Sequence, residues 1–249
     1  MQHTPLAIFA ALADEIRITR SKMEVDERVT VHTACVVRGQ YLKQPLMLVR
    51  TGVGTAAMVR AVAYVCAQYR PALCLNVGYC GGATPELVAG DLVIADCVHD
   101  TDGAASLAID AARVQHAVRA AETGALNHRV GGIVTSAQVV SDPHEKAYLG
   151  TQYTVIGIDM ESHAFVKTCN DHGTACAVTR AVIDPMDMRL PDMGDVVNEE
   201  GEIDVVGTVK HLLRKPKDLF ALPKIEYCAI QAREAIAKFI DAILSLTEQ

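Results

Sequence analysis

Short apolar runs alternate along the chain with longer segments of helical periodicity, and this alternation constrains the fold more than any other feature. Six runs predict buried strands, at residues 5–12, 72–79, 91–98, 129–135, 153–159 and 174–183. Two further runs, at 28–37 and 44–51, predict strands paired around a turn at 38–43. Predicted helices lie at 54–70, 106–123, 160–173 and 225–244, and another opens near Asp14. Strands that alternate with helices predict an α/β fold with a mostly parallel central sheet flanked by helices.

The length and composition favour one large domain. The chain has 249 residues, of which 50% are hydrophobic and 21% are charged, so it can bury a sizeable core. We expect a single domain over residues 1–249, with an appended loop and helix at about 185–224. That segment begins acidic, turns basic and contains four prolines.

The charge and the cysteines limit the partners and the compartment. A formal net charge of -7 and a pI near 5.7 argue against a nucleic-acid partner, because such proteins present a basic face. The eight cysteines form no C-x-x-C pair and have no zinc-type spacing to histidine. We therefore expect a reduced, cytoplasmic protein without a metal ion, and no segment has the 18 or so apolar residues that span a bilayer.

Two glycine-rich turns follow predicted strands. The segment TGVGTAA places Gly52, Gly54 and Ala57 in a G-x-G-x-x-A pattern, but the acid that dinucleotide folds carry about 20 residues later is absent. This turn is expected to approach a smaller polar ligand. The segment NVGYCGG lies at the end of a buried strand. Its glycines either allow the backbone to approach a ligand or belong to an ordinary turn after the strand. Cys80 has no recognisable base partner and is interpreted as a packed thiol.

Two carboxylates end apolar strands, and a buried carboxylate without a partner is costly. Glu161 follows the strand in IGIDME, and Asp184 follows the strand in TRAVIDPMD. Taken singly, Glu161 could complement a helix dipole and Asp184 could be a turn residue. Together with the glycine turns, they predict a polar crevice at one edge of the sheet.

Three segments resemble the signatures of the nucleoside phosphorylase and nucleosidase superfamily: VGYCGGATPELVAGDLVIAD, IGIDMESHAFVKTC and AVTRAVIDPMD. The chain is most similar to two branches, the 5'-methylthioadenosine/S-adenosylhomocysteine nucleosidases and the hopanoid-associated nucleoside phosphorylases. The resemblance implies that Asp184 protonates N7 of adenine and that Glu161 holds the ribose hydroxyls. It also implies that Glu15 activates water and that Met160 packs beneath the sugar. The other residues expected to bind substrate are Gly54, Tyr79, Cys80, Gly81, Val139, Val140 and Asp159.

The acceptor of the sugar is either water or phosphate. Phosphate-dependent relatives carry an N-terminal G-D-P-x-R turn and an arginine before the V-G-x-C-G segment, whereas this chain lacks the turn and has Asn76 at the second position. Val139 stands where the nucleosidases place an aromatic residue that stacks on adenine. We expect the protein to hydrolyse the N-ribosidic bond of a purine nucleoside whose base is adenine, without a cofactor. The alternatives are a phosphorylase, including one for a hopanoid-linked adenosine, and a non-catalytic nucleoside-binding protein.

The resemblance also implies a homo-oligomer, most simply a dimer, in which a neighbouring subunit completes the pocket. Residues 205–246 extend beyond the nucleosidase pattern, and their first part, VVGTVKHLLRKPKDLF, combines an apolar stripe with Lys210, Arg214 and Lys215. We interpret this segment as a helix that caps the sheet or an oligomer edge. An interfacial element on an anionic membrane is the less favoured alternative.

Overall fold

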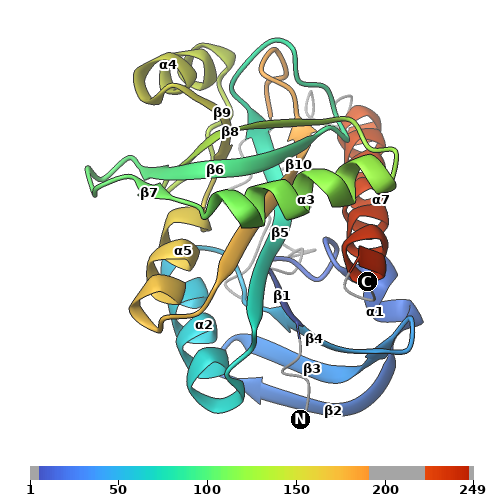
Figure 1. The fold of residues 1–249 in the computed structure, drawn as a ribbon. Coiled ribbons are helices and arrows are strands. Elements are labelled where there is room, and N and C mark those ends of the chain that lie inside the picture. Colours follow the sequence, from blue (N-terminus) through green and yellow to red (C-terminus); the bar gives the residue numbers. More distant parts are fainter. Residues whose placement is uncertain (1–5, 191–221, 247–249) are drawn as a thin grey trace, which may run out of the picture.

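Figure 1 shows the computed structural model, in which residues 6–190 and 222–246 are described. Ten strands form one sheet in this part of the chain. They are β1 Leu6–Ala10, β2 Glu24–Val31, β3 Ala34–Tyr41, β4 Gln44–Arg50, β5 Leu73–Gly82, β6 Leu92–Asp100, β7 Leu107–Ala108, β8 His128–Thr135, β9 Val155–Asp159 and β10 Cys176–Asp184. The helices are α1 Arg17–Lys22, α2 Thr55–Tyr69, α3 Ala111–Thr123, α4 Pro143–Tyr153, α5 Ser162–Asp171 and α7 Leu222–Leu246. The predicted α/β fold is confirmed.

The sheet is mixed, so the prediction of a mostly parallel sheet is not confirmed. β1 pairs in parallel with β4 and β5, β5 with β10, and β8 with β6 and β9. The pairs β2–β3, β3–β4, β5–β9, β6–β7 and β6–β10 are antiparallel. Because β5 contacts both β9 and β10, the strands β5, β9, β8, β6 and β10 close into a ring. Ring closure is a long-range pairing that the alternation of strands and helices does not reveal.

The hairpins formed by β2, β3 and β4 explain why the prediction missed one turn and placed another too broadly. The run predicted as one strand at 28–37 is interrupted at His32 and Thr33, between β2 and β3. The turn predicted at 38–43 is confined to Leu42 and Lys43, whose φ angles are 49° and 62°. Positive φ at both central residues is the backbone of tight hairpin turns, and it joins antiparallel neighbours directly.

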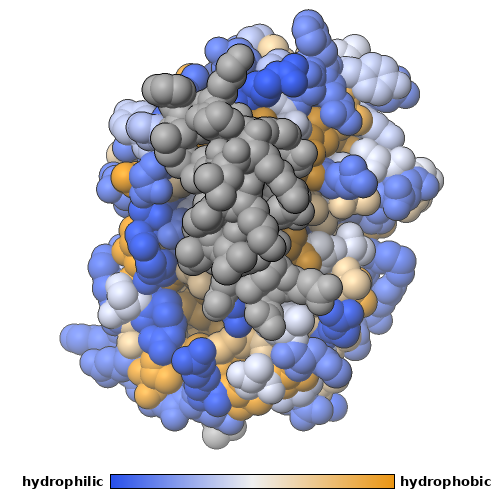
Figure 2. Space-filling model, turned by 180° about the vertical axis from the view of Figure 1, so that it is seen from behind, coloured by the Kyte–Doolittle hydropathy of each residue, from blue (hydrophilic) through white to orange (hydrophobic). Residues whose placement is uncertain are grey.

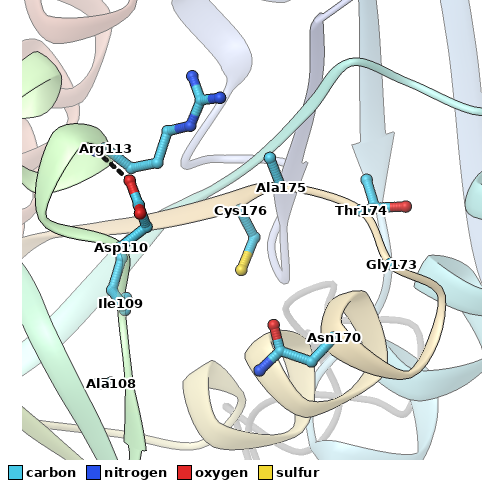
Figure 3. A pocket seen from close by; sticks show the side chains of 9 residues that line it. All are labelled: Ala108, Ile109, Asp110, Arg113, Asn170, Gly173, Thr174, Ala175 and Cys176. Carbon is cyan, nitrogen blue, oxygen red and sulfur yellow. Dashed lines mark hydrogen bonds between the residues drawn. The ribbon is translucent and has the colours of Figure 1, made fainter.

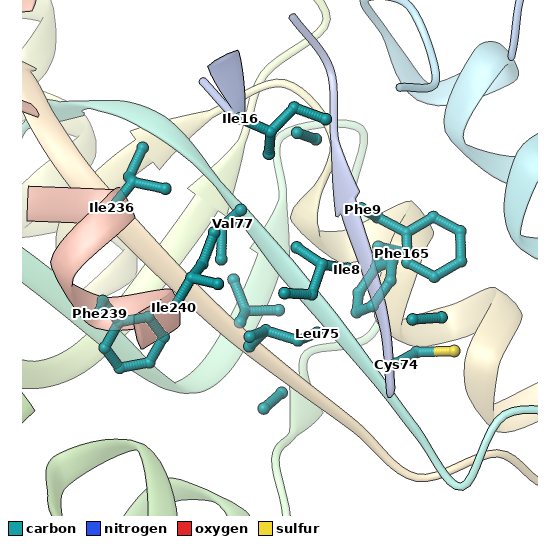
Figure 4. Close-up of a cluster of buried hydrophobic side chains, with 14 of the residues drawn as sticks. Ile8, Phe9, Ile16, Cys74, Leu75, Val77, Phe165, Ile236, Phe239 and Ile240 are labelled. Carbon is teal, nitrogen blue, oxygen red and sulfur yellow. The ribbon is translucent and has the colours of Figure 1, made fainter. Parts of the chain in front are cut away.

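Helices cover both sides of the long strand β5. In Figure 1, α2 and α5 lie on one side of β5 and α7 lies on the other. Phe9 of β1 meets Phe165 of α5 edge to face, with ring centroids 5.5 Å apart. On the other side, Ile236, Phe239 and Ile240 of α7 are buried against the sheet (Figure 4). These apolar layers hold the strands that carry the predicted acids.

Three helical regions differ from the prediction. The helix predicted at 106–123 contains strand β7 and begins only at Ala111. The helix expected near Asp14 begins only at Arg17, after a turn at residues 13–16. α4 was not predicted, although Asp142 caps its first turn by accepting a hydrogen bond from the backbone N–H of His144, and Pro143 is its first residue. Its sequence has weak amphipathic periodicity, so the cap was the available signal.

The appended loop and helix predicted at about 185–224 falls largely outside the described residues, as do Lys210, Arg214 and Lys215. No described helix is both long and apolar enough to cross a membrane. On the face opposite that of Figure 1, hydrophilic side chains are mixed with small apolar patches (Figure 2).

Candidate active site

Three neighbouring parallel strands bring the predicted catalytic acids to one region. β1 and β10 both pair in parallel with β5, so their carboxyl ends lie at the same edge. Glu15 lies in the turn after β1, and Asp184 is the last residue of β10. Both side chains are buried, with 4% and 3% exposure. The strand order therefore produces the polar region that the sequence predicts at the sheet edge.

Glu15 is held by backbone groups from two segments. The N–H of Leu12 donates to Oε2 at 2.7 Å, and the N–H of Tyr79 donates to Oε1 at 2.8 Å. Burial raises the pKa of Glu15, while the charge of Arg180 and the backbone hydrogen bonds act in the opposite direction. Both oxygens accept hydrogen bonds, as the ionised form can, and this is the form that could activate water.

Arg180 is the buried cation at the centre of the acids, and the sequence analysis did not assign it a role. Its exposure is 1%, its Nε atom donates to Oδ2 of Asp159 at 2.8 Å, and its Nη2 atom forms an ion pair with the same oxygen at 2.7 Å. Asp159 also accepts hydrogen bonds from Thr135 and Ser162. Asp159, predicted to bind substrate, is thus engaged with protein groups. Its position is that of a residue that orients Arg180.

The positions of Arg180 and Glu15 require a glycine at residue 78. A Cβ atom at this position would lie 2.3 Å from Nη1 of Arg180 and 2.7 Å from Oε1 of Glu15. Such distances are far below van der Waals contact, so any side chain would displace the arginine or the acid. The first glycine in NVGYCGG therefore leaves space for the side chains of Arg180 and Glu15.

Glu161 precedes α5 and contacts the first glycine-rich turn. Its Oε1 atom accepts a hydrogen bond of 2.8 Å from the N–H of Gly54, whose φ is 93°. Burial, and next the charge of Asp159, raise the pKa of Glu161 to about 7, against the effect of Arg180. Its side chain makes no capping hydrogen bond to α5. The alternative that Glu161 only complements the dipole of α5 therefore gains no support from a hydrogen bond to that helix. The carboxyl group instead connects Glu161 to Gly54, which lies 107 residues earlier in the chain.

Asp184 is placed by a bulge in β10. Val182 lies opposite Cys80, and Asp184 rather than Ile183 lies opposite Gly81. A Cβ atom on Gly81 would lie 3.2 Å from Oδ2 of Asp184, so glycine permits the close approach. Bulges of this kind redirect side chains near functional sites.

The partner of Asp184 is Lys146 of α4, which the sequence analysis missed together with its helix. Nζ of Lys146 lies 2.5 Å from Oδ2 of Asp184, and the lysine side chain is fully buried. The ammonium also donates to the carbonyl oxygens of Pro185 and Met188, at 3.2 Å and 2.8 Å. Burial raises the pKa of Asp184 to about 6, and Lys146 opposes that rise. An acid with this pKa can hold a proton close to neutrality.

Tyr79 and Cys80 face protein groups. The hydroxyl of Tyr79 donates to Asp14 at 2.7 Å, and Asp14 is paired with Arg233 of α7 at 2.8 Å. This chain of contacts fastens α7 to the turn that holds Glu15. The Cys80 thiol is buried, and burial raises its pKa, so it is a packed thiol rather than an activated nucleophile.

The predicted base and sugar contacts are less enclosed. Val139 is 51% exposed, and Val140 is buried in a small apolar cluster with Leu149 of α4. Met160 is half-buried, and its carbonyl oxygen accepts a hydrogen bond from Thr55 at 3.4 Å. A separate pocket of about 450 Å³, lined by Asp110, Asn170 and Cys176 among others, contains none of the predicted site residues (Figure 3).

Comparison with known proteins identifies the family. The family model of the phosphorylase superfamily matches residues 5–208, which is most of the chain. The chain belongs to the phosphorylase superfamily. It is similar to a 5'-methylthioadenosine/S-adenosylhomocysteine nucleosidase of Geobacillus thermodenitrificans, with 29% identity over 195 residues, covering 72% of this chain and 83% of that relative. The resemblance seen in the sequence is confirmed.

Solved structures agree with the superfamily fold. The S-adenosylhomocysteine nucleosidase of Streptococcus pyogenes, in complex with 5-methylthiotubericidin, superposes with a TM-score of 0.76 and 19% identity. The superposition covers 98% of this chain and 97% of that one. The 5'-methylthioadenosine/S-adenosylhomocysteine nucleosidase of Neisseria meningitidis, in complex with methylthio-immucillin-A, has a TM-score of 0.72 and 22% identity, with coverage of 95% and 98%. These likenesses support the mixed α/β fold.

The site residues that the sequence analysis missed are those that contact the predicted acids and hold them in place. Arg180 begins the R-A-x-x-D pattern on which the family resemblance partly rests, so the sequence could have indicated that it belongs to the site. Lys146 had no such signal, because it lies 38 residues before Asp184 on an unpredicted helix. Gly78 was noted as a glycine that admits a ligand, whereas the groups that occupy its free space are Arg180 and Glu15.

Proposed function

We propose that this protein is a purine nucleosidase that hydrolyses the N-ribosidic bond of an adenine nucleoside such as 5'-methylthioadenosine or S-adenosylhomocysteine. The observation that carries the proposal is the placement of Glu15, Glu161 and Asp184, all buried, at strand ends of one sheet. The similarity to 5'-methylthioadenosine/S-adenosylhomocysteine nucleosidases supports the same substrate class.

The three acids fit the charge changes of glycoside cleavage. As the bond breaks, the leaving base gains negative charge and the sugar gains positive charge. Asp184, with a pKa raised to about 6, can hold a proton for the base. An ionised Glu161 near the sugar hydroxyls would stabilise the cationic sugar, since the attraction grows in the transition state. Glu15, oriented by two N–H groups, can position and deprotonate water.

Water is favoured over phosphate by the charges already present. Among the described residues, Glu15, Asp159, Glu161 and Asp184 are buried in this region, and the two fully buried cations, Arg180 and Lys146, are already paired with carboxylates. A phosphate dianion would meet surplus negative charge. Asn76, where phosphorylases carry arginine, is a fully buried neutral amide without a partner among the described residues. It adds no charge for phosphate.

Adenine release in phosphate-free buffer tests the proposal. We expect turnover of 5'-methylthioadenosine with a free pentose as the other product, and we expect Glu15→Gln to abolish it. Strict dependence on phosphate, with a sugar 1-phosphate as product, would reject hydrolysis. Absence of turnover with methylthioadenosine, S-adenosylhomocysteine and adenosine, despite binding, would favour a nucleoside-binding protein.

The oligomer and the compartment belong to the same proposal. Val139, the expected wall for the base, is 51% exposed, so one side of the base would remain open in a single chain. A second subunit that covers this side would complete the pocket, and we propose a homodimer. We also propose a cytoplasmic location, because all eight cysteines are free thiols, as in proteins of reducing compartments. Light scattering that shows a fully active monomer would contradict the dimer.

A further inference from the structure

Four cysteines that are scattered in the sequence converge in the core. Cys66 comes from α2, Cys74 from β5, Cys169 from α5 and Cys176 from β10. The sulfur atoms of Cys66, Cys74 and Cys169 all lie within 4.8 Å of one another, and those of Cys66 and Cys74 are 4.0 Å apart. The thiol of Cys176 interacts with that of Cys169. Four separate elements thus contribute sulfur to one cluster.

This thiol cluster is remote from the candidate active site. Cys74 and Cys176 lie opposite each other near the amino ends of β5 and β10, whereas Gly81 and Asp184 lie opposite each other at the carboxyl ends. The seven steps along the chain from Cys74 to Gly81 span about 23 Å of extended strand. The proposed hydrolysis therefore uses none of these thiols.

The surroundings of the thiol cluster suit a soft metal ion. Cys74 and Cys169 are fully buried, Cys66 is 5% exposed, and Cys74 belongs to the same apolar cluster as Phe165 (Figure 4). The three ligand atoms are all sulfur, with no carboxylate among them. Thiolate ligands in a low-dielectric site select d¹⁰ ions such as Zn(II) and Cu(I) over oxygen-preferring Mg(II) or Ca(II).

The spacing of the sulfur atoms also fits. A zinc ion with Zn–S bonds of about 2.3 Å in tetrahedral geometry sets its sulfur atoms about 3.8 Å apart. The observed 4.0 Å between Cys66 and Cys74 is close to this value. The third sulfur, within 4.8 Å of both, needs a shift of about 1 Å, which a change in side-chain torsion can provide.

Cys176 provides a route to the thiol cluster from the surface. It lines the pocket of about 450 Å³ with Asn170 and Thr174, and Figure 3 shows its side chain between the strand and the end of α5. Cys176 itself is 8% exposed. Because Cys176 lies opposite Cys74 in the sheet, an ion that enters this pocket meets a thiol beside the cluster.

We propose that Cys66, Cys74 and Cys169 bind one thiophilic d¹⁰ metal ion, Zn(II) or Cu(I), with Cys176 at the entrance. Each coordinating thiol releases its proton to solvent as its metal–sulfur bond forms, and no electron is transferred. Three thiolates leave a net charge of −1 with Zn(II) and −2 with Cu(I), and a fourth thiolate would add one more negative charge in an apolar region, which is costlier. With Zn(II), a water molecule would fill the fourth position of the tetrahedron. The ion would join α2 and α5 to β5 and thereby stabilise the folded chain.

Titration of the reduced, metal-free protein tests this proposal, with Zn(II), Cd(II) and Cu(I) as separate probes. We expect native mass spectrometry to show one ion per chain and the Cd(II) complex to develop thiolate charge-transfer absorption that saturates at one equivalent. The midpoint of thermal unfolding should rise with the bound ion. Comparison of Zn(II) with Cu(I) in competition with chelators of known affinity identifies which ion the thiol cluster prefers.

Variants assign the ligands. Cys169→Ala and Cys66→Ala should lose the absorption and the thermal shift, whereas Cys35→Ala, which removes a buried cysteine of β3 outside the thiol cluster, should retain both. Wild-type stoichiometry remains decisive if a variant fails to fold. Absence of ion binding by the wild type, or its retention in folded Cys169→Ala, would overturn the proposal. A mass loss of 2 Da on mild oxidation that places a disulfide between Cys66 and Cys74, together with no metal uptake by the reduced protein, would also overturn it.

Discussion

Replacing Lys146 with methionine should raise the pKa of Asp184 and move the pH dependence of catalysis. The two charged groups are 2.5 Å apart and almost fully buried, and Lys146 lowers a pKa that burial has raised to about 6. An opposite charge at such a distance lowers the pKa of an aspartate by about 1–3 units. Removing it should therefore bring the pKa of Asp184 to about 7–9, which corresponds to about 1.4–4 kcal/mol at 1.36 kcal/mol per unit.

The sign of the change distinguishes a general acid from other roles. If protonated Asp184 is the active form, kcat/KM falls as pH rises through its pKa. The alkaline limb of the Lys146→Met profile should then move upward by about 1–3 units. The maximal rate should fall, because a weaker acid donates its proton less readily. The measurement is adenine release from 5'-methylthioadenosine between about pH 5 and pH 10.

The variant also has a cost in stability that must be measured separately. Lys146 donates to carbonyl oxygens of Pro185 and Met188, and each buried acceptor left unpaired costs about 1–3 kcal/mol. Thermal unfolding of Lys146→Met should show this loss. Lys167→Met is a matched control, since Lys167 forms a pair with Asp171 at 2.7 Å that is 61% exposed and should affect neither the profile nor the stability appreciably.

A folded Lys146→Met protein whose alkaline limb coincides with that of the wild type would refute this reasoning. Infrared spectra give a readout that does not depend on turnover. The carboxyl C=O band of protonated Asp184, assigned by its loss in Asp184→Asn, should persist to higher pH in Lys146→Met.

Three further substitutions test the other roles. Asp184→Asn should lower kcat by about two or more powers of ten with an unchanged circular dichroism spectrum, and an active variant would remove the acid assignment. The pKa of Glu161 is raised from 4.5 to about 7, so the folded state loses stability as pH rises through this range. The free energy of unfolding of the wild type should fall by about 3 kcal/mol relative to that of Glu161→Gln, and urea titrations at several pH values measure this difference. Gly78→Ala should destabilise the fold by about 1–3 kcal/mol and abolish hydrolysis, because its Cβ would meet Arg180 and Glu15; unaltered melting and activity would contradict the contact.

The sequence alone determined the features that depend on local pattern. Apolar runs identified the buried strands around Phe9, Leu75 and Val178, and glycine-rich turns marked where two strands end. Glu161 and Asp184 stood out because an acid directly after an apolar strand needs a compensating partner. A family resemblance in the same segments supplied roles for both, and the residues that the structure places around them agree with a polar cluster.

The tertiary structure decided which groups meet. Lys146 pairs with Asp184 across 38 residues, Arg180 with Asp159 across 21, and Glu161 receives the N–H of Gly54 across 107. Cys66, Cys74 and Cys169 likewise meet only because α2 and α5 pack on the same side of β5. The closed ring of strands and the mixed sheet arise from the same cause. Periodicity reports which face of an element is buried, whereas pairing between distant elements depends on how the whole chain packs, and the charge and pKa of each site residue follow from that packing.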